Sequence, residues 1–288
     1  MTATTRHDIS EHTDSSAFTT EWQTWHTAHE QSLAAPHGFL AVTSLNWLGS
    51  VPERFVDAPG LWSTVPDGVV VELAEHEELT IDGRVITGRY LFSGIPERGG
   101  VTAEYGAIAI EVALRGGKFV LRPRNPNHLL RSEFRGTPAF APQPDWVIDG
   151  RFTAYPEPVS TTVGAAVEGL EHVYAAIGEV SFRRGDDDYR LIAFDGSTPG
   201  SLQILFSDAT AGVSTYGLVR GLTVPSVGSD GSVTLDFNRA TNLPCAYTPF
   251  ATCPLPPGEN RLSLEVTAGE QLPVAVHSTP GELAHEEH

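Results

Sequence analysis

The chain has 288 residues, of which 40% are hydrophobic, enough for one large core or two of ordinary size. It carries 36 acidic against 18 basic residues, a formal net charge of -18. Because such a surface repels nucleic-acid phosphates, the composition argues against a nucleic-acid partner. No apolar run approaches the roughly 20 residues that a bilayer-spanning helix needs, so we expect no membrane partner either.

Both ends of the chain, residues 1–16 and 278–288, are polar and without a hydrophobic period, and we expect disordered tails there. The N-terminal sequence lacks the basic and apolar regions of a secretory signal. Two cysteines are too few for a disulfide framework and fit a reducing compartment. We therefore expect a cytoplasmic protein.

Residues 17–35 are expected to form an amphipathic helix. Large side chains recur there every three or four positions, at Phe18, Trp22, Trp25, His29 and Leu33. His26 and His29 share a face loosely, but no acidic third ligand lies near them in the sequence. This favours a packing role over a metal site.

Short apolar runs separated by glycine turns occupy residues 36–122. They include "VVVELA", "ELTIDG", "RVITGRYLF" and a hairpin pattern, "AIAIEVALRGGKFVLRP". This spacing predicts an antiparallel β-sandwich.

Residues 123–146 are rich in proline and predict a connector, because proline breaks helices and central strands. Strand patterns resume over residues 147–277 and close with "NRLSLEVTAGE", from Asn260 to Glu270. The whole chain is thus expected to be mainly β: an N-terminal helix followed by two packed antiparallel sandwich or barrel units.

Several blocks carry a resemblance to a known family. "PHGFLAVTSLNWL", "LRPRNPNHLL", "FSDATAGVSTYG" and "LDFNRATNLPCAYTPFATCPLPPGENRL" resemble bacterial domain of unknown function family 1684, its actinobacterial members most. The first half, with "LTIDGRVITG", is also similar to a forkhead-associated sandwich, although it has no clear Ser-x-x-His for reading phosphothreonine. The resemblance implies a fold and no reaction.

The strongest candidate site lies at the end of the strand predicted at 232–237. Asp236, Asn238, Arg239 and Asn242 crowd there, on a loop leaving a sheet. One hypothesis is an anion site, with Arg239 as anchor, the two Asn side chains in contact with the substrate and Asp236 as acid or base. The alternative is an Asp–Arg pair and two amides that satisfy backbone groups.

Further candidates lie elsewhere in the sequence. Cys245 and Cys253, eight positions apart, are interpreted as buried thiols, as a disulfide or as a reactive thiolate, with Cys245 the candidate nucleophile. His37 is the candidate titrating group, because histidine changes charge near neutral pH. Tyr216 is a candidate substrate contact. No metal ligand set is predicted, and the cofactor and oligomeric state stay open.

These features support two hypotheses about function. The first is an enzyme, hydrolase-like, that acts on a small polar or anionic metabolite in a pocket between the two β units. The second is a non-catalytic ligand-binding or protein-binding module in which the Cys- and Pro-rich segment is a structural clasp.

Overall fold

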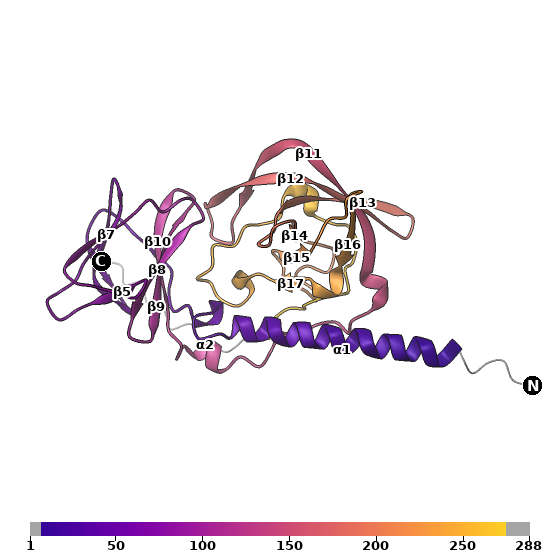
Figure 1. Cartoon of the computed structure of the whole chain (residues 1–288), viewed down its shortest axis with the longest axis horizontal. Helices are drawn as coiled ribbons and strands as arrows, with labels where there is room; N and C mark the ends of the chain where they lie inside the picture. The colour runs from indigo at the N-terminus through magenta and orange to yellow at the C-terminus, as the bar shows by residue number, and fades with distance from the viewer. Residues whose placement is uncertain (1–6, 275–288) are drawn as a thin grey trace, which may run out of the picture.

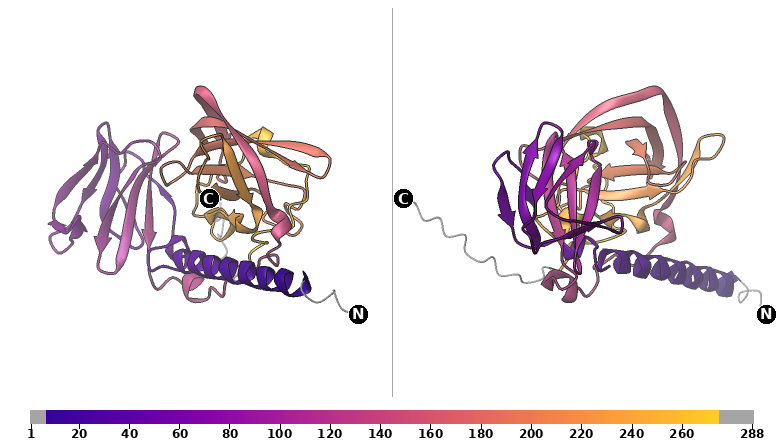
Figure 2. Two further views of the ribbon diagram at one scale, coloured as in Figure 1. Left: turned by 45° about the vertical axis from the view of Figure 1, so that its right-hand side comes forward. Right: turned by 60° about the vertical axis from the view of Figure 1, so that its left-hand side comes forward.

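The computed structural model describes the backbone of residues 7–274 and the side chains from Ser16 onward. The fold is mainly β, as predicted, with three antiparallel sheets in two units and a long helix, α1 (His7–Leu33), along their underside (Figures 1 and 2). α1 begins at His7 and so includes part of the expected N-terminal tail. Residues 1–6 and the tail expected at 278–288 lie outside the described residues.

None of the helices described is both long enough and apolar enough to cross a membrane.

The first unit is a sandwich of two sheets. One sheet has the order β1-β10-β9-β8-β5-β6 and the other the order β2-β3-β4-β7. The strands are β1 (Asn46–Trp47), β2 (Glu53–Phe55), β3 (Ala58–Val65), β4 (Gly68–Glu72), β5 (Leu79–Ile81), β6 (Arg84–Ile86), β7 (Arg89–Ser93), β8 (Gly100–Tyr105), β9 (Ile108–Arg115) and β10 (Lys118–Arg124).

Apolar residues of both sheets fill the sandwich. Trp62 of β3 is fully buried and belongs to one core cluster with Ile110 of β9 and Leu121 of β10. The predicted β9–β10 hairpin is confirmed, and it turns at Gly116 and Gly117, whose positive φ angles suit glycine. The likeness of this unit to a forkhead-associated domain stays a prediction.

The second unit is one curved antiparallel sheet with the order β16-β11-β12-β13-β14-β15-β17. Its core includes an aromatic cluster around Phe237. The strands are β11 (Val147–Gly164), β12 (Glu171–Arg184), β13 (Asp187–Asp195), β14 (Leu202–Phe206), β15 (Arg220–Val224), β16 (Ser232–Asp236) and β17 (Thr241–Asn242).

The strand predicted over Asn260–Glu270 does not form. Its backbone makes isolated bonds to neighbouring backbone, such as Leu262 N–H to the Ser207 carbonyl, and no continuous ladder. Buried side chains also bind it: Arg220 donates to the carbonyls of Val266 and Ala268, and Asp208 accepts from the Val266 N–H. Arg220 and Asp208 form an ion pair of 2.7 Å that is almost fully buried. Apolar and polar residues do alternate in this segment, but its backbone is held by this ion pair and does not form a strand.

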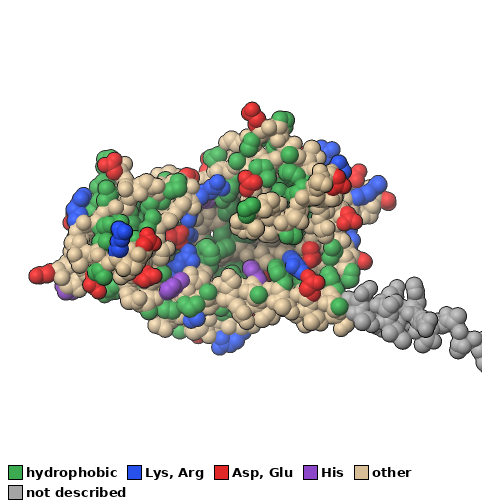
Figure 3. Space-filling model, viewed as in Figure 1, with side chains coloured by type: hydrophobic (Ala, Val, Ile, Leu, Met, Phe, Trp, Pro, Cys, Tyr) green, Lys and Arg blue, Asp and Glu red, His purple; other side chains and the backbone are tan. Residues whose placement is uncertain are grey.

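The Pro-rich connector contains a short helix, α2 (Leu129–Ser132), and lies against the C-terminal half of α1 (Figure 1). Arg131 of α2 donates to the Ala34 carbonyl just beyond α1, and Glu30 of α1 accepts from the Thr137 N–H. The space-filling view shows the molecule hollowed between its two units, above α1 (Figure 3). The connector and α1 thus lie side by side beneath the two units.

Candidate functional site

Two tryptophans attach α1 to the second unit. The Trp22 indole donates to the Asn238 carbonyl at 2.6 Å, and the guanidinium of Arg239 lies 5.4 Å from the centre of the Trp25 ring. Arg239 also pairs with Glu21 at 2.7 Å. These contacts fix which face of α1 points at the unit above.

That face carries two histidines. The ring of His26 stacks on Trp22 with centroids 4.7 Å apart, and the ring of His29 stacks on Trp25 at 5.8 Å. Both imidazole Nε2 atoms lie 3.4 Å from the same oxygen, Oε1 of Glu270. The Glu270 side chain is fully buried, so this is a buried carboxylate shared by two imidazoles.

The other carboxylate oxygen of Glu270 is held by neutral donors. Oε2 accepts from the Asn242 N–H at 2.6 Å and from the Tyr247 hydroxyl at 3.3 Å. The Tyr247 hydroxyl lies 2.8 Å from that of Thr137 in the connector. Helix, connector and second unit therefore meet at this carboxylate.

Electrostatics keep Glu270 ionised. Burial raises the pKa of this carboxyl, but contacts with His26, His29 and the Asn242 N–H outweigh burial and hold the pKa at about 2. Burial and the nearby negative charge of Glu270 raise the pKa of Tyr247, which therefore stays a hydroxyl donor.

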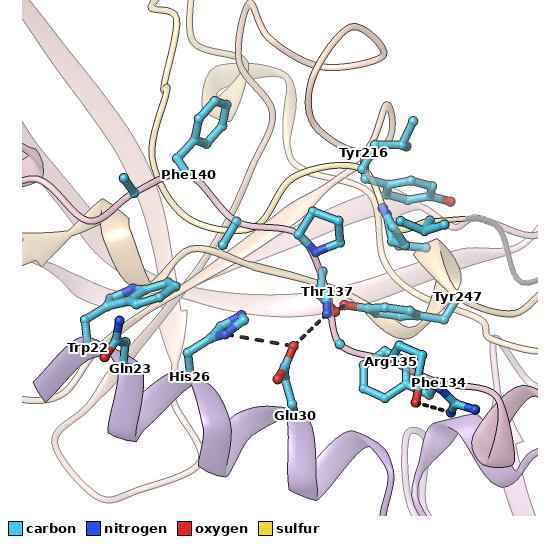
Figure 4. A pocket seen from close by; sticks show the side chains of 18 of the residues that line it. Trp22, Gln23, His26, Glu30, Phe134, Arg135, Thr137, Phe140, Tyr216 and Tyr247 are labelled. Atoms are coloured by element: carbon cyan, nitrogen blue, oxygen red, sulfur yellow. Dashed lines mark hydrogen bonds and ion pairs between the residues drawn. The ribbon is translucent and has the colours of Figure 1, made fainter. Parts of the chain in front are cut away.

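A cavity of about 1230 Å³ lies beside this cluster, and we call it the α1 cavity (Figure 4). Its polar end is formed by His26, Glu30, Thr137 and Tyr247. The remaining wall is largely apolar and includes Trp22, Leu130, Phe134, Pro138, Phe140, Pro142, Tyr216 and Leu272. A ligand with an apolar body and one polar group fits this lining.

Within the described part of the chain, no His, Cys, Asp and Glu side chains form a group of three or more that could hold a metal ion. The facing atoms of His26, His29 and Glu270 are buried and lack well-aligned hydrogen bonds. Nδ1 of His26 lies 3.9 Å from Glu30, a separation that leaves this nitrogen available to a bound molecule. The chemistry this cluster supports is proton transfer.

The polar side chains that were predicted to form a site around Arg239 are paired with one another and with the backbone. Asp236 accepts from the backbone N–H of Asn238, and its second oxygen lies 3.1 Å from Arg239. The Asn238 side chain exchanges hydrogen bonds with the backbone of Gln143. With Glu21 as a second partner, the charge of Arg239 is already neutralised. This is the arrangement of the alternative hypothesis, in which these groups satisfy one another.

Asn242 and Tyr216 lie closer to the cavities. Asn242 binds Glu270 through its backbone N–H and leaves its buried side-chain oxygen without a partner. Tyr216 lines the α1 cavity and donates to the Cys245 carbonyl at 2.8 Å. Asn242 therefore borders the Glu270 cluster, whereas Tyr216 lines the α1 cavity.

Cys245 and Cys253 are free thiols. The Cys253 sulfur accepts from the Cys245 N–H at 3.3 Å. Hydrogen bonding by the Cys253 thiol lowers the pKa of Cys245, and the Cys245 partner, together with burial, raises that of Cys253. The disulfide interpretation is therefore wrong for this structure.

His37 stands apart from the other predicted residues. Its imidazole contacts the Ala107 carbonyl of the first unit at 2.8 Å. Arg239 contacts Glu21, and the thirteen residues from Glu21 to Leu33 extend over about 18 Å of helix. The structure thus does not bring His37, Asp236 and Cys245 together around one cavity.

Sequence reasoning missed Glu270, His26 and His29 as a group. The "AGE" that contains Glu270 ended a segment predicted as a strand, and the two histidines were interpreted as packing residues. The i, i+3 spacing of the histidines was a usable signal, but their acidic partner lies at the opposite end of the chain. Only folding brings the three together.

Comparisons with known proteins identify a family but assign no reaction to it. No curated protein matches the chain. Among solved structures, an uncharacterised protein of Haloarcula marismortui is similar, at 32% identity and a TM-score of 0.41, covering 49% of this chain and 78% of that one. Residues 132–271 match the family model described as "Protein of unknown function (DUF1684)". Over these residues the chain is a member of that family, as its sequence blocks implied.

Proposed function

We propose that this protein is a hydrolase-like enzyme that carries out proton transfer on a small molecule bound in the α1 cavity. The observation that carries the proposal is the fully buried, ionised Glu270 facing His26 and His29 at the edge of this cavity. Groups whose pKa values are shifted strongly by burial and by specific partners gather at sites of chemistry. The proposal moves the reaction from the predicted His37, Asp236 and Cys245 to the underside of the second unit.

The geometry suits a carboxylate-oriented imidazole. With its Nε2 proton directed at Glu270, His26 keeps the lone pair of Nδ1 for a water molecule in the cavity. Nδ1 takes a proton from that water as the water oxygen attacks the carbonyl carbon of the substrate, and Glu270 stabilises the imidazolium that results. The imidazolium then gives this proton to the leaving alcohol or amine as the bond between the acyl carbon and the leaving group breaks. Tyr247 and Asn242 hold the carboxylate in place.

The substrate class follows from the cavity wall. Aromatic and aliphatic side chains dominate the lining. Besides His26, Glu30, Thr137 and Tyr247 it includes the polar side chains of Gln23 and Arg135. An ester or amide with an apolar acyl chain would place its carbonyl at His26 and its chain against Trp22 and Phe140. This differs from the small anionic metabolite expected from Arg239, because that arginine is already paired.

The proposal is tested by hydrolysis of p-nitrophenyl esters with acyl chains of two to eight carbons. We expect the wild type to hydrolyse at least one ester, and His26→Gln and Glu270→Gln to lose about a hundredfold or more of kcat/KM. His76→Gln, a change at an exposed histidine of the first unit, should retain full activity. No hydrolysis by the wild type, or full activity in a folded His26→Gln variant, would contradict the proposal and favour a non-catalytic binding module.

A further inference from the structure

A second cavity lies in the cleft between the two units. It measures about 310 Å³, and we call it the arginine pocket. The first unit contributes three arginines to its wall, and the second contributes an imidazole, a phenol and a thiol: Arg98, Arg115, Arg122, His172, Tyr174 and Cys253. In a chain with twice as many acidic as basic residues, this concentration of guanidinium groups is unusual.

The arginines outnumber their acidic partners. Glu111 alone pairs with Arg115 at 3.0 Å, with Arg122 at 2.7 Å and with Arg124 at 2.7 Å. The other nearby carboxylate, Glu97, accepts from the backbone N–H groups of Gly116 and Gly117. The lining itself holds three arginines and no carboxylate, so the pocket keeps an excess of positive charge. Burial and the charge of Arg122 lower the pKa of Arg115, which reflects this crowding.

Two buried nitrogens among the pocket residues, one on Arg122 and one on His172, lack partners. Arg122 is only 3% exposed, and its Nε atom makes no hydrogen bond. His172 is equally buried: its Nε2 contacts the Thr252 carbonyl at 2.7 Å, and its Nδ1 has no partner. Buried polar groups in folded proteins nearly always have hydrogen-bond partners, so unpaired groups that line a cavity indicate a ligand.

Arg98 extends the site across the cleft. Its guanidinium lies 4.3 Å from the centre of the Tyr174 ring, which belongs to the second unit. Its backbone φ of 63° is in the left-handed region, where a residue with a Cβ is strained. In this conformation the guanidinium of Arg98 contributes a positive charge to the lining of the pocket.

We propose that the arginine pocket binds the phosphate group of a small phosphate monoester. A phosphate group complements this excess of positive charge, and planar guanidinium groups bind phosphate oxygens in pairs. An adjoining cavity of about 510 Å³ continues from the pocket along Phe194, Asp195 and Leu205. The two cavities share Phe39, Arg98, Tyr174, Leu243, Pro244 and Pro254. This cavity would receive the organic part of the ligand. The phosphate site does not depend on the proposed hydrolase activity, since none of its residues lines the α1 cavity.

Isothermal titration calorimetry at pH 7.5 and constant ionic strength tests the proposal, with inorganic phosphate and phenyl phosphate as the two ligands. We expect both to bind the wild type, phenyl phosphate more tightly because its ring occupies the adjoining cavity. Arg98→Gln and Arg115→Gln should each weaken binding about tenfold or more. Arg84→Gln, at an exposed arginine of the first unit outside the pocket, is the matched control and should bind as the wild type does.

Two results would overturn the proposal. One is the absence of binding of either ligand to the wild type, and the other is unchanged affinity in both pocket variants. Equal affinity for the two ligands would support the phosphate site but overturn the role of the adjoining cavity. Arg98 is exposed, so its replacement tests binding without disturbing the core.

Discussion

At the scale of single residues, Arg239 shows how a suggestive polar cluster can be structural. Its guanidinium is paired with Asp236 and Glu21 and packs on Trp25, and its side chain is 35% exposed. Ion pairs of this exposure contribute little. We expect Arg239→Gln to lower the free energy of unfolding by about 1 kcal/mol or less, measured by urea denaturation, and to leave the activity at the α1 cavity unchanged. Loss of ligand binding in a stable Arg239→Gln variant would instead support the original anion-anchor hypothesis.

The cysteines give a second prediction at this scale. A thiol reagent should count two free thiols in the unfolded protein without reductant. In the native protein Cys245 should react first, because it is half-buried and the hydrogen bond from the Cys253 thiol lowers its pKa, whereas Cys253 is buried. The Cys245→Ser variant should show only the slow reaction. A count of zero thiols would mean a disulfide and contradict this structure.

Several residues predicted from the sequence lie near the Glu270 cluster, but the sequence did not indicate which groups they contact. The crowding of Asp236, Asn238 and Arg239 marked a constrained loop correctly. Nothing local indicated that the Asn238 carbonyl would bind Trp22, which is 216 positions away. Pairings between distant segments depend on the path of the whole chain and leave no periodic signal.

At the scale of elements, α1 is the part on which the candidate site depends. Trp22 is 9% exposed, stacks on His26 and donates to the Asn238 carbonyl. We expect Trp22→Ala to cost about 3–5 kcal/mol of unfolding free energy, measured in urea, because a large buried side chain is lost. Trp47→Ala is the control: Trp47 is 36% exposed, so a much smaller loss is expected there. Equal losses would show that Trp22 does not anchor the helix.

The spacing of apolar residues predicted α1 and most strands because each repeats over several positions. The segment from Asn260 to Glu270 shows the limit of that rule. Its alternating pattern is typical of a strand, yet its backbone is bound by isolated backbone contacts and by the side chains of Arg220 and Asp208. The periodicity of apolar residues indicates which side chains are buried. It does not indicate which groups form hydrogen bonds with the backbone N–H and C=O groups.

At the scale of the whole molecule, the free energy of unfolding should depend on pH. The carboxyls of Glu77, Glu97, Glu111 and Glu270 all have lowered pKa values in the folded chain. A folded pKa below the unfolded one gives stability that is present above the unfolded value, near pH 4.5, and is lost as the pH falls. For Glu270, whose pKa falls from 4.5 to about 2, the contribution is about 3 kcal/mol.

We therefore expect the gap in unfolding free energy between the wild type and Glu270→Gln to be larger at pH 6 than at pH 3, measured by urea denaturation. The sign follows because only the wild type carries the carboxylate that loses its charge in this range. A gap that grows on acidification would mean that Glu270 is protonated in the native protein.

The central claim is that His26 and His29 hold Glu270 as a buried carboxylate beside the α1 cavity. Carbon-13 NMR of the side-chain carboxyls, with Glu270 assigned by its loss in Glu270→Gln, tests this most directly. The account predicts that Glu270 titrates at about pH 2 in the wild type. In the His26→Gln/His29→Gln double variant its pKa should rise, because burial then opposes the charge with less compensation. A wild-type pKa at or above 4.5, or the same pKa in both proteins, would contradict it.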